Sequence, residues 1–145
     1  MSDIHGNDDY LRGVLKKAGY TKQDILVIVG DMIEKGEESL RTVRTILELQ
    51  KENPNVYAVM GNVEHFQLQM FYAEGLDACR EFIGALRWRQ EVWGRSFFMD
   101  ILEELGLCLA ELCDDNILAV KKQIREGALA RVLVPKRCLL YESSV

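Results

Sequence analysis

The chain has 145 residues, of which 48% are apolar and 28% charged. This composition suits one globular domain with a buried core and excludes a disordered or collagen-like chain. The formal net charge is -5, so we expect no nucleic-acid partner held by a general basic field. No apolar run approaches the roughly 18 residues of a membrane helix, and the N-terminus lacks a secretory pattern. We therefore expect a cytoplasmic protein without a membrane partner.

The first sixty residues alternate between helical and strand-like patterns. Apolar residues at helical spacing predict a helix over residues 8–18, and a continuous apolar run predicts a strand over residues 25–29 that is covered on both faces. A second helical pattern ends at Asn53-Pro54, and a strand over residues 56–60 follows it. The order strand, helix, strand predicts a parallel sheet with a right-handed crossover.

The pattern changes after Gly61. Residues 66–127 show helical spacing, and glycines divide the segment into several short helices; these are Gly75, Gly84, Gly94, Gly106 and Gly127. Residues 131–134 are predicted to begin a further strand before Pro135. The fold class is therefore α/β, with a βαβ start followed by a helical segment. We expect one domain over residues 1–145, divided into an α/β part (1–65) and a mainly helical part (66–145).

The cysteines do not have the spacing of a metal knuckle or a disulfide framework. Four are present, and no two form a Cys-x-x-Cys pair: Cys79, Cys108, Cys113 and Cys138. We expect them to be small buried apolar residues in a reducing compartment.

Three polar clusters lie at predicted ends of strands or beginnings of helices. Asp3 and His5 precede the first helix, Asp31 follows the first apolar strand, and Asn62 follows the second. The carboxyl ends of parallel strands share one edge of a sheet, so these side chains are expected to converge. An imidazole, two carboxylates and an amide oxygen suit manganese, iron or zinc, and an aspartate can bridge two cations.

Three stretches of sequence carry a family resemblance. They are Ser-Asp-Ile-His-Gly-Asn (residues 2–7), Gly-Asp-Met-Ile-Glu-Lys-Gly (30–36) and Gly-Asn-Val-Glu (61–64). Together they resemble the calcineurin-like metallophosphoesterase superfamily, and most of all its bacterial serine/threonine protein phosphatases. The resemblance covers about the first 65 residues and implies part of a metallophosphoesterase-type sheet.

The resemblance also implies roles for individual residues. Asp3 and His5 would bind one metal ion, Asp31 would bridge two ions, and Asn62 would bind the second. Lys35 would attract the phosphate, as a point charge rather than a bidentate fork. Manganese is the expected metal, with iron or zinc as alternatives. Two such cations, about 3.5–4 Å apart, acidify a bridging water and clamp the phosphoryl oxygens. The implied activity is hydrolysis of phosphate monoesters in a phosphorylated protein or small molecule.

Two departures from the family pattern affect this interpretation. Val63 occupies the place of a histidine that protonates or stabilises the leaving oxygen, so no catalytic acid is intact. His65 is not expected to replace it, because residues 63 and 65 differ by about 200° around a helix. No histidine follows position 65, so the second metal site is expected to be incomplete.

The sequence leaves three interpretations open. The chain is a metal-dependent phosphoesterase, a non-catalytic fragment or degenerate paralogue that binds a metal or a partner, or an unrelated α/β domain whose clusters are caps and turns. The strand before Asp3 is reduced to Met1 and Ser2, so an incomplete domain is expected. Its exposed strand edges favour self-association.

Overall fold

The computed structural model describes residues 1–133, 138 and 139. Its first half contains the predicted alternation of elements, which lie close to their predicted limits. Helix α1 (Asp8–Ala18) precedes strand β1 (Leu26–Val29), and helix α2 (Ser39–Glu52) precedes strand β2 (Val56–Val59). Asn7 caps α1, because its side-chain oxygen accepts the Tyr10 backbone N–H at 2.9 Å. The α/β class and the βαβ start are therefore confirmed.

The strands form a short parallel sheet. β1 pairs with β2, and β2 pairs with β3 (Cys138–Leu139). The chain start extends the sheet beyond β1, because Ser2 forms a parallel bridge with Val29 and the Val29 N–H donates to the Met1 carbonyl at 2.7 Å. Asp3 therefore leaves the sheet beside the carboxyl end of β1, next to the turn that carries Asp31.

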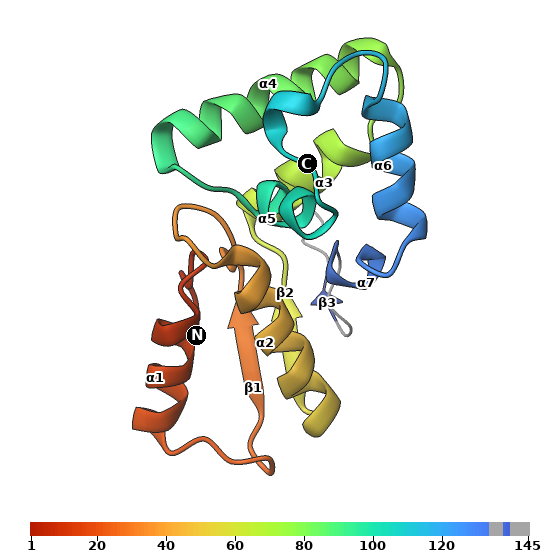
Figure 1. Ribbon diagram of the computed structural model, residues 1–145. Coiled ribbons are helices and arrows are strands. Elements are labelled where there is room, and N and C mark those ends of the chain that lie inside the picture. The colour runs from red at the N-terminus through yellow and green to blue at the C-terminus, as the bar shows by residue number, and fades with distance from the viewer. Residues whose placement is uncertain (134–137, 140–145) are drawn as a thin grey trace, which may run out of the picture.

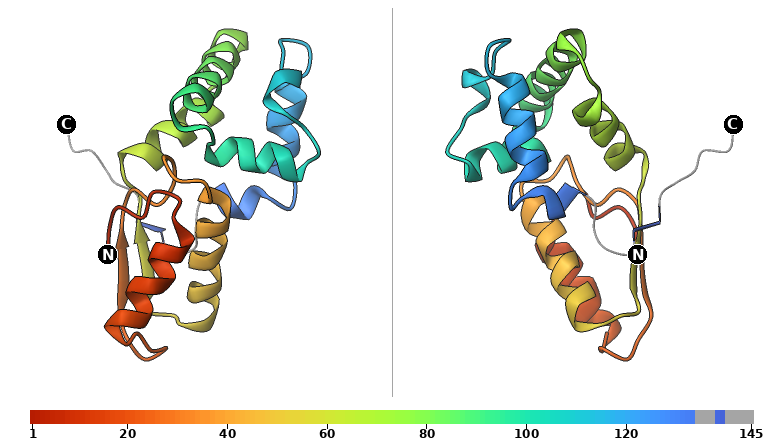
Figure 2. Two further views of the ribbon diagram at one scale, coloured as in Figure 1. Left: turned by 60° about the vertical axis from the view of Figure 1, so that its left-hand side comes forward. Right: turned by 90° about the vertical axis from the view of Figure 1, so that its right-hand side faces the viewer.

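Both N-terminal helices cover the same face of the sheet (Figure 2). On that face Ile28 and Ala58 are fully buried against Leu11 of α1 and Ile46 of α2. The burial predicted for both faces of β1 is wrong within the described residues: Val27 is 40% and Val29 52% exposed. An apolar run shows that a strand can be buried on both faces, but burial also requires helices on each side of the sheet, and here the described helices α1 and α2 cover one face only.

The second half is helical and lies beyond the carboxyl ends of the strands (Figure 1). Its elements are α3 (Asn62–Tyr72), α4 (Leu76–Trp93), α5 (Phe97–Glu104), the 3₁₀ turn Leu109–Glu111, α6 (Ile117–Glu126) and α7 (Ala130–Leu133). Within the described residues this confirms the helical segment. The strand predicted over residues 131–134 is wrong for residues 131–133, which lie in α7, while residue 134 lies outside the described residues. A short apolar run does not by itself distinguish a strand from a buried helical turn.

Three phenylalanines from three helices form the centre of the helical part. The Phe71 and Phe98 rings stack with centroids 4.9 Å apart, and Phe82 meets Phe98 edge to face at 5.1 Å. Lys121 of α6 is buried beside them, with its ammonium 5.1 Å from the Phe82 ring centroid and 3.3 Å from the Ala73 carbonyl oxygen. The lysine therefore satisfies a carbonyl at the C-terminal end of α3 while its stem packs in the core.

The cysteines only partly follow the prediction. Cys79 is buried, whereas Cys108 and Cys113 are exposed, so the burial expected for these two is wrong. Both lie in the irregular stretch around the 3₁₀ turn, outside the α-helices. The side chain of Cys138 lies outside the described residues. None of the described helices combines the length and apolar character needed to cross a membrane.

Gly84 does not divide two helices as predicted, because it lies inside α4. A Cβ atom built at this position would meet nothing within 4 Å. We predict that Gly84→Ala stabilises the chain by about 0.5–1 kcal/mol, since alanine loses less backbone entropy on folding. Urea unfolding measures the change. Gly94→Ala is the matched control and should not stabilise the chain, because Gly94 has a φ of +77°.

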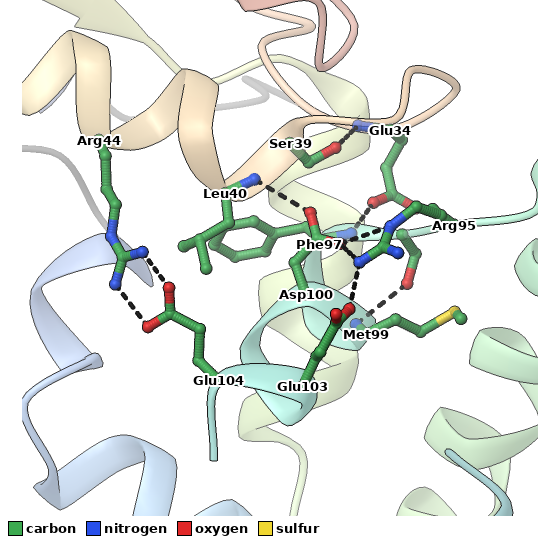
Figure 3. A network of polar contacts seen from close by, with 11 residues as sticks. Glu34, Ser39, Leu40, Arg44, Arg95, Phe97, Met99, Asp100, Glu103 and Glu104 are labelled. Carbon is green, nitrogen blue, oxygen red and sulfur yellow. Dashed lines mark hydrogen bonds and ion pairs between the residues drawn. The ribbon is translucent and has the colours of Figure 1, made fainter. Parts of the chain in front are cut away.

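An ion pair on the surface joins the two halves of the chain. Arg44 of α2 donates two hydrogen bonds to Glu104 of α5 (Figure 3). These bonds hold the pKa of Glu104 below its ordinary value. A depressed carboxyl pKa stabilises the folded state above the ordinary value of about 4.3, and this stabilisation is lost as the pH falls.

We predict that Glu104→Gln lowers the free energy of unfolding by about 0.2–1 kcal/mol at pH 7. The difference from the parent chain should shrink as the pH falls below about 4. Urea titrations at both pH values, with the exposed Glu126→Gln as control, measure this. A difference that grows at low pH would contradict the assignment.

Candidate metal centre

Two loops at the carboxyl edge of the sheet carry the predicted metal ligands. Backbone hydrogen bonds join them directly: the His5 N–H donates to the Asp31 carbonyl at 2.9 Å, and the Gly6 N–H donates to the Met32 carbonyl at 2.8 Å. The turn before α1 and the turn after β1 therefore form one rigid unit. This unit fixes the separation of the side chains that it presents.

Three of the four predicted ligands converge at this edge. Asp3, His5 and Asp31 each offer a ligand atom, and these atoms all lie within 4.8 Å of one another. The His5 Nε2 atom is 3.5 Å from Asp3 Oδ1. The Asp3 side chain is 66% exposed and that of His5 23%. The cluster is thus open on one side, where a ligand could approach, and closed on the other.

All three residues have a left-handed backbone. The φ angles are 55° at Asp3, 47° at His5 and 49° at Asp31. Residues with a side chain rarely adopt this region, and such strain persists only where the surroundings impose it. Every other non-glycine residue of positive φ in the described part of the chain also lies in the second loop, at Glu34 and Lys35. Backbone strain is therefore concentrated around the cluster.

Two glycines allow the strand ends to approach each other closely. A Cβ atom on Gly30 would lie 2.9 Å from the Gly61 Cα, and one on Gly61 would lie 2.7 Å from the Asp31 nitrogen and 2.9 Å from Asp31 Oδ1. Neither position can hold a larger residue without moving the backbone. The Asp31 carboxylate therefore lies against the beginning of α3.

The carboxylate of Glu64 ties the loops after β1 and β2 together. One of its oxygens accepts the N–H groups of Met32 (2.5 Å) and Ile33 (3.1 Å). The other accepts those of Asp31 (3.1 Å) and Gly61 (2.9 Å). Glu64 is only 5% exposed. Four backbone donors thus converge on one buried carboxylate, which fixes the backbone on either side of the Asp31 side chain.

The remaining predicted residues lie around this cluster. Asn62 is the first residue of α3 and is exposed directly after Gly61; Lys35 is exposed in the same loop as Asp31. Val63 is half-buried and packs against the core, whereas His65 is exposed. The two side chains therefore have different surroundings, as a helix beginning at Asn62 requires.

The donor set suits a divalent cation. Carboxylate oxygens and an imidazole nitrogen are the ligand types that manganese, iron and zinc share. The buried His5 Nδ1 atom makes no hydrogen bond to the described residues. The ring is therefore held by packing and by the loop backbone, and its other nitrogen faces the carboxylate of Asp3.

The sequence matches the calcineurin-like phosphoesterase family over residues 1–125. The chain belongs to this family. Membership of this family is consistent with the short parallel sheet at the start of the chain. It supports the metallophosphoesterase resemblance that the sequence carries.

Two curated relatives carry the name bis(5'-nucleosyl)-tetraphosphatase, symmetrical. The protein from Wigglesworthia glossinidia brevipalpis is 35% identical over 75 residues, which cover 51% of this chain and 26% of the relative. The one from Buchnera aphidicola subsp. Schizaphis graminum is 31% identical over 87 residues, which cover 54% of this chain and 32% of the relative. The chain spans about a third or less of the length of these relatives. No solved structure matches the chain.

Sequence reasoning assigned no role to Glu64. A signal for it exists: a glutamate three residues after the N-cap Gly61 is the second half of a capping box, and here it accepts the Gly61 N–H. Its hydrogen bonds to residues 31–33 could not be predicted from the neighbouring sequence, because they form only when the ends of β1 and β2 lie side by side.

We predict that Glu64→Gln releases both loops. One amide oxygen cannot accept four N–H groups, and the amide NH₂ would face backbone donors. The free energy of unfolding should fall by about 2–4 kcal/mol, and the affinity for Mn²⁺ should fall by about tenfold or more. Urea unfolding and calorimetric titration with Mn²⁺ measure the two effects. The exposed Glu74→Gln is the matched control, and an equal effect from it would refute this role.

Proposed function

We propose that the chain is a metal-dependent phosphoesterase whose metal ligands are Asp3, His5, Asp31 and Asn62. The convergence of three donors from two loops within 4.8 Å carries the proposal. Their left-handed backbone supports it, because strain of this kind collects at functional sites. The bonds that Glu64 makes give the rigid support that a metal site needs.

Manganese is the proposed metal, with iron or zinc as alternatives. Asp3 and His5 would hold the first ion with Asp31, and Asp31 with Asn62 would hold a second ion more weakly. A bound divalent ion supplies an acidified water and a positive charge for the phosphoryl oxygens. The protein's own part is to fix the carboxylates and the imidazole, and to present the ammonium of Lys35 to an anionic substrate.

A small phosphoester or phosphoanhydride is the proposed substrate class. The relatives named symmetrical bis(5'-nucleosyl)-tetraphosphatases favour a dinucleoside polyphosphate. The resemblance of the motifs to bacterial serine/threonine protein phosphatases favours a phosphorylated protein as the second candidate. The bond to be cleaved is a phosphoanhydride in the first candidate and a phosphate monoester in the second, so a comparison of their rates distinguishes them.

Val63 favours a different candidate function, in which the chain binds a metal ion without turnover. Its aliphatic side chain packs against the core and cannot give a proton to a leaving oxygen. Under this alternative the cluster binds metal ions and phosphate, but Val63 supplies no proton to the leaving oxygen. Aryl phosphates, whose leaving group needs little protonation, separate the two functions.

The test is hydrolysis of an aryl phosphate and of a bis(5'-nucleosyl) tetraphosphate with Mn²⁺. We predict that Asp31→Asn lowers turnover and Mn²⁺ affinity by about 100-fold or more, since a lost ligand costs at least as much as a lost supporting contact. Asparagine tolerates the left-handed backbone, so the fold should persist.

The exposed Asp115→Asn is the matched control and should leave both values unchanged. Mn²⁺ binding without turnover of either substrate would favour the binding module. If the folded chain neither binds Mn²⁺ nor hydrolyses either substrate, the metal site is refuted. The three polar clusters are then helix caps and turns of an α/β domain.

A further inference from the structure

The loop that carries Lys35 is held in a strained form. Glu34 has a φ of 70° and Lys35 one of 68°. Two consecutive left-handed residues with side chains are unfavourable and relax unless other groups hold them. Lys35 itself is exposed, so the groups that hold this turn must act through its neighbours.

Glu34 is the buried anchor of the turn. Its side chain has no exposed surface, and its carboxylate accepts the Phe97 N–H at 2.6 Å, at the beginning of α5. Its own N–H donates to the Ser39 hydroxyl at 2.9 Å. Figure 3 shows Glu34 between these partners, with the loop on one side and α5 on the other. The helical part of the chain therefore holds the backbone of this loop.

Arg89 of α4 supplies the charge that faces Glu34. Its Nε atom lies 3.1 Å from Glu34 Oε2, and the residue is 8% exposed. Burial raises the pKa of Glu34 and lowers the pKa of Arg89, because both lose hydration. The two opposite charges therefore compensate each other in the interior, and removing one leaves an uncompensated buried charge.

Gly36 fixes the other side of Lys35. A Cβ atom on Gly36 would lie 2.8 Å from the carbonyl carbon of Gly6, so this residue presses against the loop that carries His5. Lys35 thus stands between a buried anchor and a glycine packed beside the metal ligands. The position of its ammonium depends on both.

We propose that Glu34 and Arg89 are positioning residues that hold Lys35 for binding a phosphoryl group beside Asp3, His5 and Asp31. This inference rests on the proposed function of the cluster. It assigns different tasks to two buried carboxylates: Glu64 fixes the metal ligands, and Glu34 fixes the cation that meets the substrate. Loss of the Glu34–Arg89 pair should therefore lower the affinity for phosphate and leave the affinity for Mn²⁺ almost unchanged.

The experiment is a double-mutant cycle on the Mn²⁺-loaded full chain, with calorimetric titration of inorganic phosphate and of Mn²⁺. Arg89→Met and Lys35→Met should each raise the phosphate Kd by about fivefold to tenfold, because each removes the contact between the Lys35 ammonium and the phosphate. The double variant should be no weaker than Lys35→Met alone, because Arg89 acts through Lys35. The Mn²⁺ Kd should stay within about twofold. For a substrate that turns over, KM should rise more than kcat falls.

Arg87→Met is the matched control, since Arg87 is an exposed residue of the same helix. If Arg89→Met does not fold, Arg89→Lys keeps the charge and should show a smaller rise in the phosphate Kd. An unchanged phosphate Kd in a folded Arg89 variant overturns the inference. The proposed function is not affected by this result if the parent chain still binds Mn²⁺ and turns over substrate. Additive losses in the cycle, or an equal loss of Mn²⁺ affinity, also overturn the inference. Failure of the parent chain to bind Mn²⁺ refutes the proposed function, and the inference with it.

Discussion

The site depends on one buried carboxylate. Glu64 accepts four backbone N–H groups from the turns after β1 and β2, and no side chain with a single acceptor atom could serve both turns. Gly30 and Gly61 can approach each other because neither has a Cβ atom, and this approach brings the N–H groups of both turns to Glu64. Hydrogen bonds from N–H groups to a carboxylate are stronger than those between neutral groups, so this contact holds both turns firmly. The backbone that carries Asp31 is therefore held in place beside Asp3 and His5.

The two halves of the chain contribute to the site in different ways. The α/β half brings Asp3, His5 and Asp31 to one edge through parallel strands, and the helical half holds the loop of residues 31–36 through Phe97 and Arg89. Contacts between them are polar as well as apolar: Asp100 of α5 accepts the Leu40 N–H at the beginning of α2, and Arg95 donates to Asp100 (Figure 3). Burial raises the pKa of Asp100, and the Arg95 hydrogen bonds oppose this rise. The helical part is therefore a structural support of the loop as well as a separate core.

Much of the first half could be predicted from local patterns. The strand β1 and the convergence of Asp3, His5 and Asp31 follow from apolar periodicity and from the geometry of parallel strands. The pairing of Glu34 with Arg89 could not be predicted, because 55 positions separate them and no periodicity links a loop carboxylate to a helix four elements later. The exposed face of Val27 was missed for a related reason, since a strand's composition does not reveal which layers are present.

The left-handed backbone at Asp3, His5 and Asp31 also restricts how the site can evolve. Glycine, asparagine and aspartate tolerate this conformation, whereas β-branched side chains do not. Substitutions at these positions are therefore expected to favour residues that keep the backbone conformation of the turns, even where the new side chain offers no ligand atom. A descendant of this chain could therefore replace the side chains at these three positions and still keep the backbone conformation of the turns.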